Sequence, residues 1–249
     1  MSATTRPFRA LLRKLVLSPY LDLFGALLVL GVCIARDFHQ TIFFQGEIQF
    51  GIPLRELTGY VVQGAYPLGI LSTIGAILSL MATRLVGRQR NLGNMFGVVT
   101  TINSGLNDFL FGNGSAAITY PLTFLIQTFA VSRWAKGEQI RKRDKYFYII
   151  VGVGLVLGFF LVFLGAKVFG GRMDIGFLST VSLAFGLSLG ANFSNALKYE
   201  ETWLSWIIYN IVQLVKNSML MNLANVVKYV FYLFNAVITL GDWKLNGDR

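Results

Sequence analysis

Long apolar stretches separated by short polar connections run through the whole chain. They approach or reach the ~20 residues that cross a bilayer as a helix, and we predict spans over about 20–35, 63–83, 92–111, 115–132, 146–166, 175–197, 203–220 and 223–240. Apolar residues do not alternate at every second position, as the strands of a membrane barrel would require. Residues 36–58 are polar and predict a loop, and residues 5–17 predict a basic amphipathic segment on the membrane surface.

The Lys and Arg residues gather in the connections on one side of the predicted bundle. The most basic loop is 133–145, and the connections on the opposite side hold few basic residues, namely Arg36, Arg55, Lys167 and Arg172. By the positive-inside rule, both termini of this multi-pass membrane protein are expected to be cytoplasmic. Lys216 and Lys228 fall near the outer ends of the last two spans, where we expect them to snorkel.

Composition agrees with a membrane protein and narrows its chemistry. The chain has 249 residues, of which 54% are hydrophobic and 14% charged, against roughly 25% charged in soluble domains. The net charge of +10 lies in the loops, so it does not indicate nucleic-acid binding. The sequence has one cysteine, Cys33, and one histidine, His39. This excludes an internal disulfide and a metal site built from several cysteines or histidines. We expect no catalytic residues, no metal and no cofactor. Lipid is an expected partner, and the oligomeric state, a homo-oligomer included, stays open.

One span carries a row of hydrogen-bonding residues. Trp206, Asn210, Gln213 and Asn217 follow at steps of four, three and four, which places them on one helical face. Neutral amides beside an indole at membrane depth predict a pathway for a polar solute that is uncharged or weakly cationic.

An earlier part of the chain repeats this pattern. Leu71-Ser-Thr-Ile-Gly recurs as Leu178-Ser-Thr-Val-Ser, and the residues that align with Trp206, Asn210, Gln213 and Asn217 are Phe96, Thr100, Asn103 and Asn107. We therefore predict an all-α fold of two parallel three-helix repeats, 63–134 and 171–243. Between them lies 135–170, a basic cytoplasmic loop and a linker helix. The other predicted segments are 1–18 (amphipathic), 19–62 (an extra transmembrane helix and outer loop) and 244–249 (cytoplasmic tail).

Parallel repeats of this kind place a substrate site at their interface near mid-membrane. The candidate substrate-binding residues are Trp206, Asn210, Gln213, Asn217, Gln127, Asn103, Asn107, Thr100, Tyr120 and Asn235. Gln127 stands out because it is the one strongly polar residue in the middle of its span. The alternative is that the amides only hold helices together, at roughly 0.6 kcal/mol each. Six amides on related faces favour a ligand.

Other polar and aromatic residues have simpler explanations. Trp134 and Trp203 fall near span ends and are expected to be interfacial anchors. Asp108 and Asp174 fall at outer helix ends, where a solvated cap is expected. With no Asp, Glu, Lys or Arg at a span centre, the sequence does not support proton coupling. The lack of a central cation to hold phosphate argues against a mononucleotide as substrate.

Two motifs resemble a known family. Arg90-Asn-Leu-Gly-Asn-Met-Phe-Gly and Lys198-Tyr-Glu-Glu-Thr-Trp-Leu-Ser-Trp-Ile-Ile-Tyr-Asn look like the bacterial PnuC nicotinamide riboside transporters, which are SWEET-like. The resemblance covers about 63–243, and Thr100 stands where it leads us to expect Asn. It implies facilitated, alternating-access uptake of nicotinamide riboside, part of vitamin B3 and NAD metabolism, with trapping by a separate kinase.

Two further functions remain open. The same architecture suits a facilitator for another small polar solute, such as a sugar or a different vitamin. A membrane scaffold that transports nothing is the other alternative, and it would tolerate loss of Asn210 and Gln127.

Overall fold

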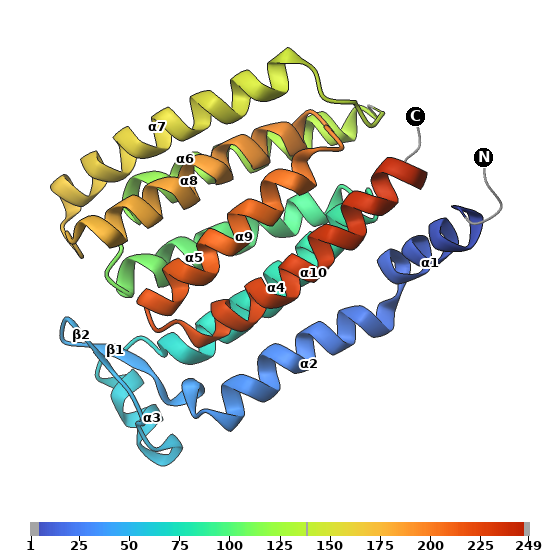
Figure 1. Cartoon of the computed structure of the whole chain (residues 1–249). Coiled ribbons are helices and arrows are strands. Elements are labelled where there is room, and N and C mark those ends of the chain that lie inside the picture. The colour runs from blue at the N-terminus through green and yellow to red at the C-terminus, as the bar shows by residue number, and fades with distance from the viewer. Residues whose placement is uncertain (1–4, 138, 247–249) are drawn as a thin grey trace.

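Ten α-helices make up most of the computed structural model, which describes residues 5–137 and 139–246 (Figure 1). They are α1 Thr5–Leu17, α2 Pro19–Ala35, α3 Leu54–Val62, α4 Leu68–Gly87, α5 Leu92–Leu110, α6 Ala116–Ala135, α7 Lys145–Phe169, α8 Ile175–Ala196, α9 Thr202–Met219 and α10 Leu223–Asn246. The protein is an all-α, multi-pass membrane protein, as predicted. We call the end of the bundle where both termini lie the terminal end, and the opposite end, where the strands lie, the hairpin end (Figure 1).

The predicted spans correspond to α2 and α4–α10. Among the described helices, α4, α7, α8 and α10 are long and apolar enough by themselves to cross a membrane, and α1 with α2 forms one further, bent candidate. The helices α5, α6 and α9 fall short of that criterion. Many of their polar residues are buried, among them Thr101, Thr123 and Asn210, so their composition already marks the interior as polar.

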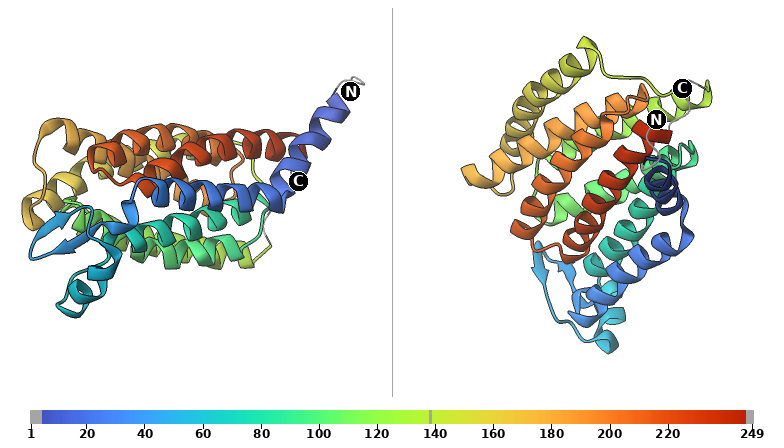
Figure 2. Two further views of the ribbon diagram at one scale, coloured as in Figure 1. Left: turned by 90° about the horizontal axis from the view of Figure 1, so that it is seen from below. Right: turned by 45° about the vertical axis from the view of Figure 1, so that its right-hand side comes forward.

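The chain bends by 53° between α1 and α2, and α1 projects away from the bundle (Figure 2). Ser18 caps α2 by accepting a hydrogen bond from the Leu21 N–H at 3.3 Å, and Pro19 follows at the first helical position. Because proline has no N–H to continue α1, the break falls at this point. Leu12 and Val16 of α1 pack against Ile238 of α10.

Residues 36–58 were expected to be a loop, and the structure corrects that expectation. After the short 3₁₀ helix Phe38–Gln40, the strands β1 Ile42–Phe44 and β2 Glu47–Gln49 pair antiparallel, with Phe43 opposite Ile48. Gln45 and Gly46 both have positive φ (52° and 89°), as a two-residue hairpin turn requires. The helix α3 begins within the same stretch. Three-residue strands are too short to leave a clear alternation in sequence.

Helix α7 lies at the edge of the bundle and packs on α8 (Figure 1). The approach is close because glycines face each other: a Cβ on Gly158 would come within 2.5 Å of the Gly186 backbone. The remaining long helices form two neighbouring groups, α4–α6 and α8–α10, which meet where α4 packs on α10 and α6 on α8.

Tryptophans close the terminal end of the interior. Trp134, Trp203 and Trp243 are at most 5% exposed and pack on one another. The Trp134 and Trp243 indoles donate to the main-chain oxygens of Asn195 and Gly87, each at 2.8 Å. Trp134 and Trp203 are therefore core residues, which corrects the expectation of interfacial anchors. A span end in sequence is also the place where loops fold back and cover a side chain.

Asp174, by contrast, is the exposed helix cap that its position predicted. Its carboxylate accepts a hydrogen bond from the Phe177 N–H at 2.9 Å at the start of α8 and pairs with Arg172 at 3.0 Å. The Phe177 N–H and the Arg172 guanidinium hold the pKa of Asp174 below its ordinary value. Both contacts favour the ionised carboxylate at the positive end of the helix dipole.

Candidate functional site

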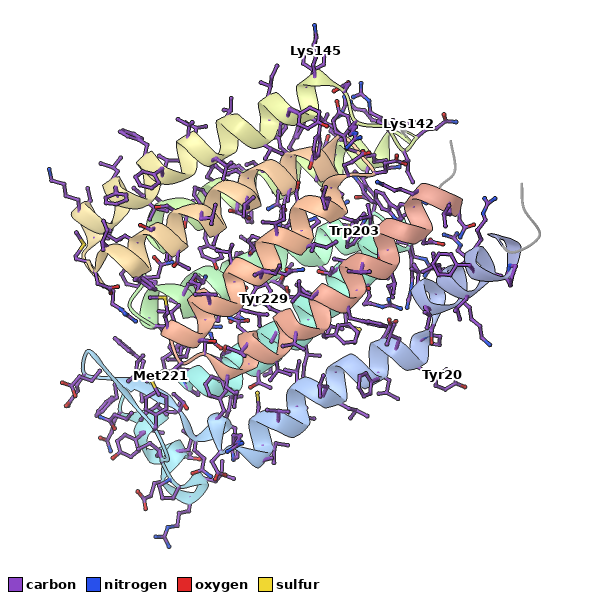
Figure 3. All side chains as sticks on the ribbon, in the orientation of Figure 1. Tyr20, Lys142, Lys145, Trp203, Met221 and Tyr229 are labelled. Atoms are coloured by element: carbon purple, nitrogen blue, oxygen red, sulfur yellow. The ribbon has the colours of Figure 1, made fainter. Side chains whose placement is uncertain are left out.

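A polar cavity lies between α4, α5, α6, α8, α9 and α10. Its volume is about 150 Å³, and every lining residue belongs to one of these six helices except Asn113, which lies in the α5–α6 turn. The described residues of α7 contribute none, in keeping with the wholly apolar sequence of that span. Trp203 marks the side of the cavity nearest the terminal end, and Tyr229 lies deeper toward the hairpin end (Figure 3).

Gln127 of α6 links the two helix groups across the cavity. Its Oε1 accepts a hydrogen bond from the Thr101 hydroxyl at 2.7 Å, and its Nε2 is 3.5 Å from Oδ1 of Asn192 on α8. Asn192 in turn donates to the Ser188 oxygens on its own helix. The weak Gln127–Asn192 contact is the member of this network that connects the groups. A ligand that offers better partners could replace it at small cost.

Helix α9 presents its polar face to the cavity through Trp206, Asn210 and Gln213. Trp206 is only partly buried, and its ring packs edge-on against Tyr209 at 5.0 Å. Asn210 is 2% exposed, and its Oδ1 has no hydrogen-bond partner among the described residues. An unsatisfied buried acceptor is rare in folded proteins. Asn210 Oδ1 is therefore an acceptor that a ligand in the cavity can engage.

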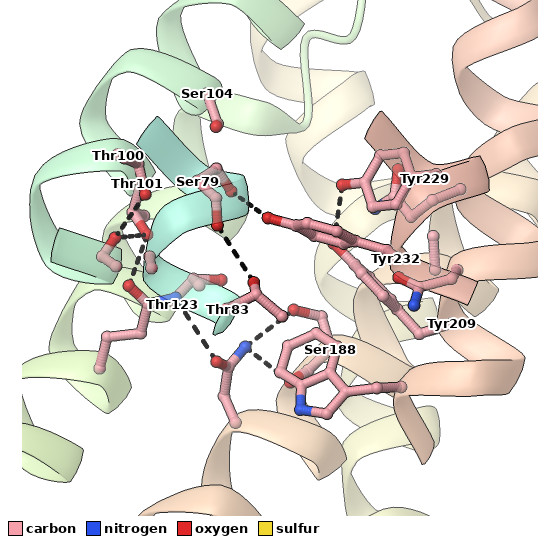
Figure 4. A pocket seen from close by; sticks show the side chains of 18 of the residues that line it. Ser79, Thr83, Thr100, Thr101, Ser104, Thr123, Ser188, Tyr209, Tyr229 and Tyr232 are labelled. Atoms are coloured by element: carbon pink, nitrogen blue, oxygen red, sulfur yellow. Dashed lines mark hydrogen bonds between the residues drawn. The ribbon is translucent and has the colours of Figure 1, made fainter. Parts of the chain in front are cut away.

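Three tyrosines form the wall on the α9–α10 side, facing the hydroxyls of α4 and α5 (Figure 4). The Tyr209 and Tyr229 hydroxyls lie 3.3 Å apart, and the Tyr232 hydroxyl lies 2.8 Å from Ser79 Oγ of α4. The rings meet edge to face. This wall offers aromatic surface and hydroxyl groups together, which suits a flat polar ligand.

A charged cluster lies toward the hairpin end of the cavity. Asp108 Oδ2 accepts hydrogen bonds from Lys216 Nζ at 2.5 Å and from the Tyr120 hydroxyl at 2.9 Å. Lys228 lines the same end, and all three charged residues are at most 3% exposed. We call Asp108, Lys216 and Lys228 the hairpin-end cluster. It corrects three expectations: Asp108 is no solvated cap, the lysines do not snorkel, and the interior does hold cations.

The sequence-predicted site residues separate into two groups. Those that line the cavity are Trp206, Asn210, Gln213, Gln127, Thr100 and Tyr120. Those that the structure leaves outside it are Asn103, Asn107, Asn217 and Asn235. Asn103 faces α4, where it donates to the Leu71 oxygen at 3.1 Å, and Asn107 donates to Asn103. Asn217 donates back to Gln213, and Asn235 accepts a hydrogen bond from Arg84.

The rotation of α5 about its axis explains why Thr100 lines the cavity while Asn103 and Asn107 do not. Its lining residues include Gly97, Thr100, Thr101, Ser104 and Asp108, which lie on the stripe next to the one that carries Asn103 and Asn107. The sequence prediction aligned the amides of α5 with those of α9, and it therefore selected the stripe of α5 that faces α4. The small hydroxyl residues of α5 give too weak a signal in sequence to prefer their own stripe.

Several cavity residues were missed by the sequence reasoning, among them Lys216, Lys228, Tyr229, Tyr232 and Asn192. Lys216 was recognisable, because it follows Gln213 by three positions on the face already identified. An ionisable residue within an apolar helix is also a functional signal by itself. The tyrosines leave no such signal, since aromatic residues are common on every face of membrane helices.

Comparison with known proteins adds independent findings. A family model described as nicotinamide mononucleotide transporter matches residues 69–245. The chain is also similar to a solved structure, described as the crystal structure of the vitamin B3 transporter PnuC, with a TM-score of 0.60 and 18% identity; the similarity covers 77% of this chain and 86% of that one. At such identity the likeness shows a shared fold. The comparison with curated proteins found no match.

Proposed function

Because this chain belongs to the nicotinamide mononucleotide transporter family, we propose that it carries nicotinamide riboside across the membrane by facilitated diffusion. The observation that carries this choice of substrate is the unpaired Oδ1 of buried Asn210, one helical turn from Trp206. Nicotinamide riboside offers a carboxamide N–H to that oxygen and a cationic ring to the indole.

The contacts we propose follow from the chemistry of the ligand. A pyridinium ring over Trp206 gains about 0.5–2 kcal/mol from cation–π attraction. Gln213 and Gln127 each donate and accept, so they suit the ribose hydroxyls. Ligand oxygens and N–H groups would then replace the long Gln127–Asn192 contact of 3.5 Å.

We further propose alternating access, in which α4–α6 and α8–α10 act as repeats that move against each other. The cavity volume of about 150 Å³ supports movement, because sites for small molecules measure about 300–1,000 Å³. Asp108 is engaged by Lys216, Tyr120 and Asn113. These bonds tie Asp108 to α6, to the α5–α6 turn and to α9, so we propose for it a structural role, which favours facilitated over proton-coupled transport. A separate cytoplasmic kinase then traps the riboside.

The orientation we propose has both termini in the cytoplasm of a bacterial inner membrane. Both termini and the basic connection between α6 and α7 lie at the same end of the bundle (Figure 1), and Arg141 and Lys142 of that connection are exposed. Positively charged loops remain on the cytoplasmic side during insertion.

Proteoliposomes test transport directly. We expect labelled nicotinamide riboside to equilibrate across the membrane without an ion gradient, and to accumulate beyond equilibrium only when kinase and ATP are enclosed. Excess unlabelled sugars or other vitamins in the same assay would compete if the substrate belongs to another class. Uptake that requires a proton gradient would overturn the facilitated mechanism.

A matched pair of asparagine variants tests the site. Asn210→Ala removes the unpaired cavity acceptor, and we expect riboside affinity to fall about tenfold, the value of one lost polar contact. Asn103→Ala removes an amide that faces α4, outside the cavity, and affinity should stay within about twofold. Equal loss in both variants, or in neither, would contradict the assignment.

A further inference from the structure

Lys228 of α10 is a buried cation of the cavity that lacks a polar partner. It lines the cavity and is 3% exposed. Its ammonium lies 4.5 Å from the centre of the Tyr229 ring and 5.7 Å from that of Tyr232. Within residues 5–137 and 139–246, it makes no hydrogen bond and no ion pair. Two aromatic faces offset only part of the cost of removing an ammonium from water.

The carboxylate of the hairpin-end cluster is engaged by other groups. Oδ2 of Asp108 accepts hydrogen bonds from Lys216 Nζ at 2.5 Å, from the Tyr120 hydroxyl at 2.9 Å and from Asn113 Nδ2 at 3.2 Å. The cluster therefore holds two ammonium groups and one carboxylate, which leaves a single positive charge in excess. Charged residues inside a membrane bundle are usually paired or lie on the path of an ion or substrate. One monovalent anion would balance this excess.

Hydroxyl groups beside Lys228 have hydrogens to donate. The Tyr209 and Tyr229 hydroxyls lie 3.3 Å apart, and the Tyr232 hydroxyl lies 2.8 Å from Ser79 Oγ. Each pair shares one hydrogen bond but has two hydroxyl hydrogens, so one hydrogen of each pair remains for another acceptor. All these residues line the cavity. An ammonium with hydroxyl donors near it is a suitable site for an anion.

The proposed substrate makes the excess charge more costly. Nicotinamide riboside is a cation, and its proposed ring and amide contacts are Trp206 and Asn210. Asn210 and Lys216 are six residues apart, about 9 Å along α9, which sets the scale of the distance from the ring to the cluster. Two positive charges at that separation repel each other more strongly in a low-dielectric interior than in water. A counter-ion at the cluster would offset this repulsion.

We propose that Lys228 binds a small monovalent anion of the chloride type at the hairpin end of the cavity, with hydroxyl hydrogens of the tyrosine wall as further donors. The anion balances the second ammonium of the hairpin-end cluster. A single-atom anion suits the site because the cavity, of about 150 Å³, must also admit the base and ribose. Its role as counter-ion of the riboside rests on the proposed function, whereas its binding to Lys228 does not.

Isothermal titration of the purified full-length chain with nicotinamide riboside tests the counter-ion role. Titrations in sodium chloride and in sodium gluconate are compared at equal ionic strength, because gluconate has the same charge on a much larger molecule. We expect the riboside Kd to be about fivefold lower in chloride, and bromide should act like chloride. In Lys228→Met the Kd should not depend on the anion. It should be close to that of the unaltered protein in chloride, because neither protein then has an excess charge.

Melting curves without riboside test the anion site by itself. In the unaltered protein, chloride at about tenfold excess over its Kd should raise the melting temperature by roughly 3–5 °C relative to gluconate. Lys228→Met should lose this shift, and Lys228→Arg, which keeps the charge, should keep most of it. Lys142→Met removes one charge from an exposed loop position and should keep the full shift, which separates a bound anion from general screening of surface charge.

The outcomes separate the two proposals. If the riboside binds equally well in chloride and gluconate and chloride leaves the melting temperature unchanged, the anion site is refuted and the proposed function stands. A chloride effect that persists in Lys228→Met also refutes it, because the anion then binds elsewhere. If chloride stabilises the unaltered protein but not Lys228→Met, and no riboside binds in either salt, the anion site stands and the proposed function fails.

Discussion

Two ionic clusters, one near each end of the bundle, contain the same charges but differ in how those charges are paired. Near the terminal end, Arg84 and Arg88 share the carboxylate of Asp22. At the hairpin end, Lys216 and Lys228 lie near the single carboxylate of Asp108. Each cluster thus has two cations and one anion. Whether the surplus cation is satisfied distinguishes a structural cluster from a candidate binding site.

The terminal-end cluster satisfies its surplus charge with main-chain oxygens. Arg84 donates to Asp22 at 2.6 Å, to Asn235 at 2.8 Å and to the carbonyls of Leu15, Val16 and Ser18. Arg88 donates to Val16 and Ser18 as well. These carbonyls lie where α1 ends, and the C-terminal end of a helix attracts cations. The bend between α1 and α2 therefore holds both guanidinium groups.

The largest effect should come from breaking the terminal-end cluster. Arg84→Met removes the donor to Asn235 and one of the two donors to Asp22, and removing one partner of a buried ion pair costs about 3–5 kcal/mol. We expect a large fall in the melting temperature, which is measured in detergent by tryptophan fluorescence. Arg84→Lys keeps the charge but loses the planar set of donors. Its melting temperature should therefore lie between those of the unaltered protein and Arg84→Met. Equal stability of all three proteins would contradict the structural role.

Breaking the paired half of the hairpin-end cluster should have a smaller effect. Lys216→Met leaves Asp108 with Tyr120 and Asn113, and a buried group that loses its main partner costs about 2 kcal/mol. Lys228 lies close enough to compensate in part. Adding Asp108→Asn to Lys216→Met removes the stranded carboxylate and should restore most of the loss. A double variant less stable than the single one would show that Asp108 does not depend on Lys216.

These clusters also show how far the sequence could lead. Hydropathy located every long helix, with ends that agree to within about six residues, because apolar length has a direct physical cause in the bilayer. The polar face of α9 was predictable through Trp206, Asn210 and Gln213, since large amides are conspicuous among apolar neighbours. Lys228 was assigned to snorkelling because distance from a helix end does not reveal whether a neighbour covers it.

Contacts between segments far apart in the chain could not be predicted from the sequence for a related reason. Arg84 lies 62 positions after Asp22 and 151 before Asn235, and periodicity carries no information about pairing over such separations. The stripe of α5 that faces the cavity likewise depends on how α4 and α6 pack against it. Asn103 and Asn107 were plausible site residues until the neighbouring helices fixed the rotation.

Removing the surplus charge should stabilise the empty protein. Lys228→Met replaces an ammonium that contacts two aromatic rings and has no hydrogen bond to any residue that the structure describes, and burying a polar group without a hydrogen bond costs about 1–3 kcal/mol. We expect the melting temperature of the ligand-free protein to rise by the equivalent of about 1 kcal/mol. The matched surface variant Lys142→Met should change it by less than about 0.5 kcal/mol. A clear loss of stability in Lys228→Met would mean that Lys228 is satisfied and that the two clusters are alike.

The smallest effect on stability is expected at Asn210, and Asn235, which accepts from Arg84 of the terminal-end cluster, provides the comparison. Asn210→Leu removes an amide whose Oδ1 has no partner among the described residues, so stability should change by roughly 0.6 kcal/mol or less. Asn235→Leu makes the same chemical change where Oδ1 accepts from Arg84 at 2.8 Å, and it should cost about 1–3 kcal/mol. Melting curves of the two variants, with riboside titrations beside them, separate structure from binding. Asn210 is a binding residue if its variant melts normally and binds poorly, and a variant that melts early would place it with Asn235 instead.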